Sequence, residues 1–122
     1  MRIDEELLDG LSARAAASPR LRVHFDLRDS EEDGSMRMLN ALEPGTVIPV
    51  HRHCDTSEDV VCLRGCVEEV VYDDDGRELE RWRLSPRSGV MACHVPKGQY
   101  HTCVPLESKN GKYDPRSTED LL

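Results

Sequence analysis

The sequence predicts an all-β fold, a small sandwich or barrel, preceded by one short α-helix. Apolar residues recur at helical spacing in residues 3–16. From residue 21 onward, short alternations of apolar and polar residues are separated by turn signals at fairly even intervals, which is typical of a β-sandwich or barrel. We therefore expect an N-terminal helix over residues 1–17, packed on a single barrel domain over residues 18–122 that ends in a polar tail.

The predicted helix is supported by its apolar face and by its ends. Acidic residues in the first turn favour the helix macrodipole, whereas Gly10 weakens the helix slightly. Ser18-Pro19 ends it, because the residue before a proline is pushed out of the helical region. The residues at helical spacing are Ile3, Leu7, Leu8, Leu11 and Ala15.

The rest of the chain has the pattern of short strands. Residues 21–27 alternate cleanly between apolar and polar, as a half-buried strand does. Asp75-Gly76 is a strong hairpin signal, because this pair readily adopts left-handed dihedral angles. Pro44-Gly45 marks a further turn. We expect strands at residues 21–27, 36–41, 47–50, 58–63, 67–72, 79–84, 90–95 and 100–106.

The composition argues against several classes of partner. Sixteen Lys and Arg against 24 Asp and Glu give a net charge of −8, so the chain repels nucleic-acid backbones and anionic membranes at long range. Only 4% of the residues are aromatic, too few for a protein that stacks on bases. The N-terminal segment lacks the basic start and unbroken apolar stretch of a signal peptide. We expect a cytoplasmic protein that binds neither nucleic acid nor membrane and keeps its five cysteines reduced.

A histidine-rich segment, GTVIPVHRHCDTSEDVVCLRG at residues 45–65, carries the chemistry. His51 and His53 are two residues apart, so both imidazoles leave the same face of an extended backbone. Glu58 follows across a turn and can approach the same point. Gly45 and Gly65 mark the tight turns that bring the strands together.

A second segment, GVMACHVPKGQYH at residues 89–101, places His101 just after the turn Pro96-Lys97-Gly98. Three imidazoles and one carboxylate suit a divalent first-row transition metal. Four protein ligands leave one or two positions open on a six-coordinate ion, which favours a Lewis-acid or oxygen-binding centre over a closed structural site.

The two segments resemble the paired motifs of the cupin superfamily. The first matches the pattern G(X)5HXH(X)3–4E(X)6G without a departure. The second keeps Pro96, Gly98 and His101 of the pattern G(X)5PXG(X)2H(X)3N, but it has one extra residue after Gly89 and Pro105 in place of Asn. The resemblance implies a double-stranded β-helix, a small jelly-roll barrel with a metal in its mouth. It also implies one divalent metal per chain (Fe, Zn, Mn or Ni) held by His51, His53, Glu58 and His101.

A narrower resemblance, over residues 18–117, is to the WbuC-type cupin-fold metalloproteins. It rests on SPRLRVHFDL, MLNALEPGT, YDDDGR, VPKGQYHT and KNGKYDP. Members tend to be encoded among surface-polysaccharide synthesis genes, which implies a sugar-related ligand, and the family habit implies a homodimer. An apolar strand that usually precedes the last of these segments is missing here, so we expect an open barrel edge or a strand supplied by a partner.

Further side chains are candidates for binding a small-molecule substrate. Arg22 and His24 share one strand face, opposite to Val23 and Phe25. Arg22 suits an anionic group because its planar guanidinium binds oxyanions in a bidentate manner. His24 is the candidate general base, since an imidazole titrates near neutral pH; an exposed edge-strand face is the alternative for both. The resemblance adds Tyr113, as a donor at the barrel mouth or as an apolar anchor of the tail.

The remaining histidine and several thiols are interpreted as structural. Strand alternation places Cys62 on the face of Glu58 and Cys103 on the face of His101, which points both thiols into the barrel interior. We expect both to be small buried apolar side chains. His94 is expected to be structural or exposed, and Arg64 is expected at the outer surface.

Two functions of different kinds fit this sequence, and it leaves open whether the protein is an enzyme. The first is a metal-dependent enzyme that isomerises, epimerises or oxygenates a small polar metabolite, which the resemblance relates to sugars or sugar nucleotides. The second is a non-catalytic, metal-containing module that binds or senses a small ligand, since a fold alone does not fix function.

Overall fold

One helix and seven short strands make up residues 1–106, the part of the chain that the computed structural model describes. The β-rich fold with a short N-terminal helix is confirmed, while Tyr113 and the polar tail lie outside the described residues. The elements are α1 (Glu5–Ala17), β1 (Arg22–Asp26), β2 (Met38–Leu42), β3 (Glu58–Val61), β4 (Val67–Tyr72), β5 (Glu78–Leu84), β6 (Ala92–Val95) and β7 (Tyr100–Pro105).

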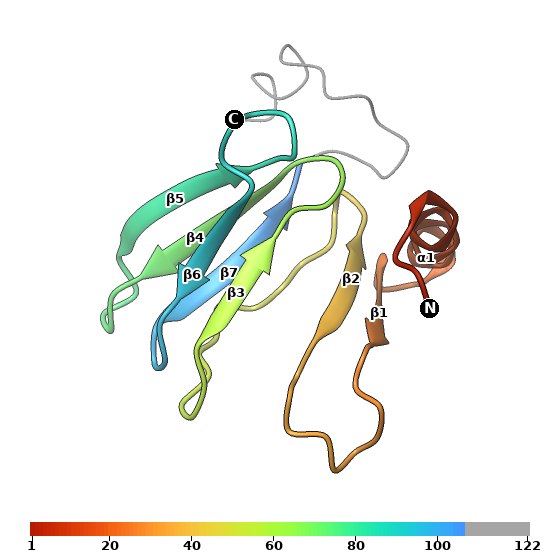
Figure 1. Cartoon of the computed structure of the whole chain (residues 1–122). Helices are drawn as coiled ribbons and strands as arrows, with labels where there is room; N and C mark the ends of the chain where they lie inside the picture. Colours follow the sequence, from red (N-terminus) through yellow and green to blue (C-terminus); the bar gives the residue numbers. More distant parts are fainter. Residues whose placement is uncertain (107–122) are drawn as a thin grey trace.

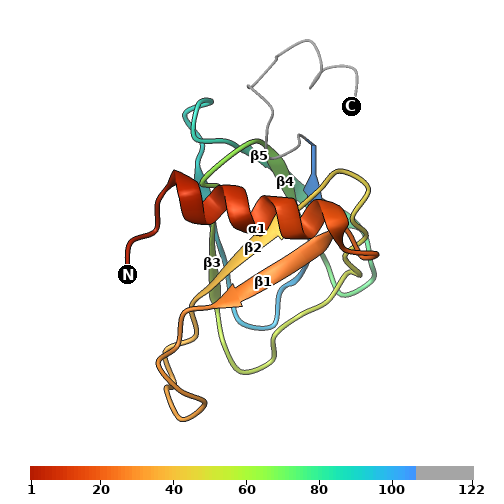
Figure 2. The same ribbon diagram turned by 90° about the vertical axis from the view of Figure 1, so that its right-hand side faces the viewer.

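The strands form three small antiparallel sheets in the described part of the chain (Figure 1). β1 pairs with β2, β3 pairs with β6, and β4 lies between β5 and β7. α1 contacts β1 and β2 and lies across the outer face of this pair (Figure 2). Most expected strands are present with slightly different ends.

Residues 47–50 are the exception to the predicted strands, since no ladder forms there. Pro49 lacks a backbone donor, so a segment of four residues around it cannot build a regular ladder. The segment is held instead by the Thr102 hydroxyl, which donates to the Ile48 carbonyl at 2.6 Å. Strand-like pairing starts only at His51, which forms an isolated bridge with His101.

Helix α1 begins and ends where its capping residues dictate. The Asp4 carboxylate accepts a hydrogen bond from the Leu7 backbone N–H at 3.0 Å, which caps the N-terminus. Ser18 is extended, as expected before Pro19. Leu11 and Ala15 are buried. This helix is too short and too polar to cross a membrane, and the described residues contain no other helix.

Arg64 ties the helix to the loop that follows β3. Its guanidinium forms ion pairs with Glu5 and with Asp9, the latter at 2.8 Å. Only 18% of the Arg64 side chain is exposed, so it lies between the helix and the loop rather than free at the outer surface as expected. Sequence spacing gave no signal for this contact, because the partners are more than 50 positions apart in the chain.

The core is centred on strand β4, which is flanked on both sides. Val70 on β4 and Leu84 at the end of β5 are fully buried. Glu68 and Glu69 on β4 are also buried, although they are neighbours and point to opposite faces of the strand. Both faces of this central strand are therefore covered.

Replacing Leu84 by alanine should lower the free energy of unfolding by about 2–5 kcal/mol, because a buried leucine loses its transfer energy and leaves a cavity. Leu79 on the same strand is 56% exposed, so Leu79→Ala should change the stability by less than about 0.5 kcal/mol. Urea denaturation of both variants measures the difference. Equal losses of stability would show that the core is not centred on this part of β5.

Candidate metal centre

Backbone hydrogen bonds bring the two histidine segments together. The His51 N–H donates to the His101 carbonyl at 3.0 Å, and the His101 N–H donates to the His51 carbonyl at 2.8 Å. The His53 carbonyl accepts from the Gly98 N–H at 2.8 Å. The turn at residues 96–98 and the start of β7 therefore fix the backbone on which His51 and His53 lie.

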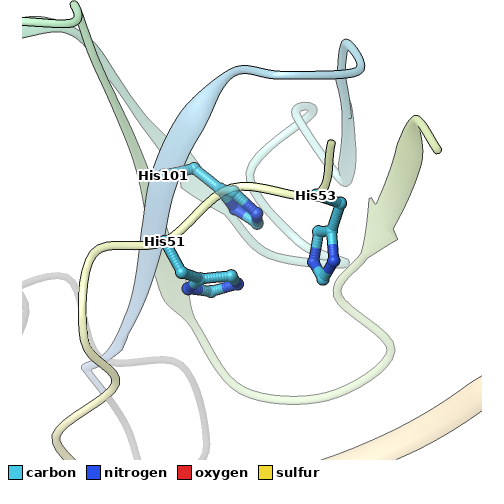
Figure 3. Close-up of side chains that lie close together, drawn as sticks. All are labelled: His51, His53 and His101. Carbon is cyan, nitrogen blue, oxygen red and sulfur yellow. The ribbon is translucent and has the colours of Figure 1, made fainter. Parts of the chain in front are cut away.

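The three imidazoles converge on one point (Figure 3). One ligand atom from each of His51, His53 and His101 lies within 4.8 Å of the others. The rings of His51 and His53 are 5.2 Å apart between centroids, and those of His51 and His101 are 4.4 Å apart. The expectation that these three side chains meet is confirmed.

Hydrogen bonds at Nδ1 orient two of the rings. His51 Nδ1 donates to the Pro49 carbonyl at 2.8 Å, so its lone pair is on Nε2. His101 Nδ1 lies 2.5 Å from Glu69 Oε1. This leaves His101 Nε2 buried and without a hydrogen-bond partner. A buried polar atom left in this way costs about 1–3 kcal/mol, and a metal ion would satisfy it.

Glu58, the fourth expected ligand, lies beside the cluster at the start of β3. Its Oε2 is 3.0 Å from His53 Nε2 and 3.8 Å from His101 Nε2. The side chains of His53 and Glu58 are 47% and 38% exposed, whereas that of His101 is only 4% exposed. The cluster thus has one buried side and one side open to solvent.

The separations are close to those that a bound ion requires. Two nitrogens on one ion at about 2.1 Å each are at most about 4.2 Å apart. The largest separation in the group is 4.8 Å at most, so a small movement of the exposed His53 side chain would bring all three within reach. The donor set, three imidazoles beside a carboxylate, fits a divalent transition metal.

Sequence reasoning missed Glu69, the carboxylate that holds His101. On the β4–β7 ladder Val71 is opposite His101 and Glu69 is opposite Cys103, so Glu69 is a diagonal neighbour of His101 on the same sheet face. The hydrogen bond to Glu69 raises the pKa of His101 and outweighs the opposite effect of burial. An acidic residue in a valine-rich strand was the available signal, but only the register shows which histidine it meets.

Two of the thiols near the site, Cys93 and Cys103, have raised pKa values. Burial, together with the negative charges of Glu69 and Glu58, raises the pKa of Cys93 to about 11. Burial and the charge of Glu69 also hold the pKa of Cys103 far above its usual range. Cys62 is buried, as expected, and its Sγ donates to the Arg64 carbonyl at 3.3 Å. Thiolates are the metal-binding form, so the raised pKa values of Cys93 and Cys103 disfavour these two sulfurs as ligands.

The other candidate residues lie on different elements. His24 is exposed on β1 opposite Asn40, and Arg22 is opposite Leu42 on the same ladder. That ladder does not carry the three histidines, so a role of these two residues in substrate binding stays a prediction. His94 is 60% exposed, and its Nδ1 lies 2.6 Å from Asp59 Oδ1, which agrees with the exposed alternative.

Gly98→Ala should lower the free energy of unfolding by about 1–2 kcal/mol, because Gly98 has a φ of +83° and alanine is strained there. Gly34→Ala is the matched control, since an added Cβ there would meet nothing within 4 Å and the backbone is not left-handed. Thermal unfolding of both variants makes the comparison. A Gly98→Ala protein as stable as Gly34→Ala would contradict a turn that depends on this conformation.

Comparison with known proteins gives one family. No curated protein and no solved structure matches the chain. A model of a domain of unknown function, DUF6016, matches residues 3–84. This range contains His51, His53, Glu58 and Glu69 and ends before His101. Because the match covers more than half of the 122 residues, the chain belongs to the DUF6016 family.

Proposed function

We propose that this chain is a cupin-type metalloprotein in which His51, His53, Glu58 and His101 hold one divalent transition-metal ion. The observation that carries the proposal is the buried Nε2 of His101. It has no hydrogen-bond partner and belongs to a group whose ligand atoms lie within 4.8 Å of one another. A metal ion accounts for both facts at once.

The arrangement of the strands supports the cupin part of the proposal. Glu58 begins β3 and His101 lies on β7, so the carboxylate and the imidazole come from two separate antiparallel ladders. A site that takes side chains from separate antiparallel sheets is what a small jelly-roll barrel provides. A homodimer formed through an open strand edge belongs to the same proposal.

The open side of the cluster is where a small molecule would bind. His53 and Glu58 are the exposed members, so a ligand approaching from solvent meets them first. The bound metal would act as a Lewis acid that polarises an oxygen of that ligand. A small polar metabolite related to sugars or sugar nucleotides is the proposed substrate class, with isomerisation, epimerisation or oxygenation as the reaction.

A non-catalytic binding or sensor module is the second candidate. The contacts that the two carboxylates near the site make with the histidines favour this second candidate. Glu58 contacts His53 and His101, and Glu69 contacts His101, so both are already engaged with imidazoles rather than placed as a general base. Turnover of a sugar-type substrate would favour the enzyme, whereas ligand-induced stabilisation without turnover would favour the module.

The metal assignment predicts the metal content of three histidine variants. His51→Ala and His101→Ala should lose the metal while remaining folded but less stable, because each removes one ligand nitrogen. His94→Ala should keep about one metal per chain, since His94 pairs with Asp59 on the outer surface. The measurement is elemental mass spectrometry on protein purified without a metal-affinity column.

Circular dichroism of the same samples shows whether each variant is folded. Wild-type protein that holds no metal, even after divalent ions are added back, would refute the proposal. Unchanged metal content in both folded ligand variants would refute the assignment of the site.

Added metal should also stabilise the protein in a way that depends on Glu58. At a free metal concentration 100 times the Kd, binding contributes about 2.7 kcal/mol, which raises the Tm by roughly 10 °C for a domain of this size. Glu58→Gln should show a clearly smaller rise at the same metal concentration, because a neutral amide is a weaker ligand. Glu80→Gln changes an exposed glutamate on β5 and should behave as wild type. A full rise in the Tm of Glu58→Gln would remove Glu58 from the ligand set.

A further inference from the structure

We propose that Glu69 is a positioning residue of the metal centre, which holds the His101 ring so that its Nε2 faces the ion. The inference rests on the proposed metal-binding function and adds to it a residue outside the ligand set. Glu69 touches His101 and acts on the metal only through it.

The geometry supports this role directly. Glu69 Oε1 lies 2.5 Å from His101 Nδ1, and the two side chains are only 1% and 4% exposed. A carboxylate accepts and does not donate, so the proton of the neutral imidazole is on Nδ1 and the lone pair is on Nε2. In protein metal sites such a carboxylate fixes the ring orientation and increases the basicity of the ligand nitrogen.

The neighbouring Glu68 shows what a buried glutamate on this strand does when it serves only the fold. Glu68 is 4% exposed, and its Oε1 accepts a hydrogen bond from Arg81 at 2.9 Å. Glu69 is more deeply buried, and its Oε2 has no hydrogen-bond partner. Burying a carboxylate is costly unless it has a partner, and the partner of Glu69 Oε1 is His101.

The surroundings of Glu69 favour a fixed carboxylate. Cys103 lies opposite Glu69 on the β4–β7 ladder, and Val70, the next residue along β4, is fully buried. A side chain enclosed in this way loses little further freedom when the metal binds, which is the condition for a preorganised site.

The test compares Zn²⁺ affinity in three variants of the full chain. Glu69→Leu keeps the approximate volume and removes the acceptor, and it should bind Zn²⁺ about 10–100-fold more weakly. Glu69→Gln keeps an acceptor oxygen and should lose less than about tenfold. Glu68→Gln is the matched control, a change at a buried neighbour that pairs with Arg81 instead of His101, and it should bind as wild type. Competition with a chromophoric chelator gives each Kd.

A second measurement reports the ring itself in the metal-free protein. At a pH at which the His101 ring is neutral, nitrogen-15 NMR should show its proton on Nδ1 in wild type and a loss of this preference in Glu69→Leu. A merely structural role of Glu69 would change stability without changing the tautomer of the folded protein. If Glu69→Leu does not fold, the wild-type tautomer decides, and a proton on Nε2 overturns the inference.

The two proposals fail in different ways. Wild-type protein that does not bind Zn²⁺ refutes the metal-binding function, and the positioning role falls with it. Wild-type protein that binds Zn²⁺ beside a folded Glu69→Leu variant of equal affinity overturns only the role of Glu69.

Discussion

A pair of backbone hydrogen bonds between His51 and His101 is the constraint on which the site depends. These bonds join residues that are 50 positions apart in the chain and lock the start of β7 against an otherwise irregular segment. Because the backbone is fixed at both residues, the imidazoles need only rotate about their side-chain bonds to meet. The Gly98 N–H then fixes His53 from the adjoining turn, so all three histidines depend on the strand that carries only one of them.

The cluster has two halves with different physical properties. The buried half consists of His101 and Glu69, both nearly inaccessible to solvent, where hydrogen bonds are strong and an unpaired atom is costly. The open half consists of His53 and Glu58, whose side chains are partly exposed to solvent and lie 3.0 Å apart. The buried core therefore holds the His101 ring in place, whereas the exposed side gives solvent access to the cluster.

Much of this arrangement could be predicted from local patterns, and the rest depends on register. The spacing of His51 and His53 fixed their shared face, and the turn before His101 placed it on a following strand, so the histidine cluster was predictable. Glu69 and Arg64 were not, because their partners are decided by which strands and loops become neighbours. Pro49 prevented the ladder that we expected at residues 47–50.

The pKa values of the thiols bear on which metal ion the proposed site would bind. Cys93 and Cys103 are both partly buried, and a thiolate-rich pocket would select soft metals. Burial and the nearby carboxylates raise both thiol pKa values instead, so the negative charge stays on oxygen. Glu58 lies beside the imidazoles and Glu69 contacts His101, so in the proposed site one carboxylate would be an oxygen ligand and the other would orient a ligand. A site built in this way presents nitrogen and oxygen donors, the set that suits iron, manganese, nickel or zinc and leaves space for a ligand at the exposed side.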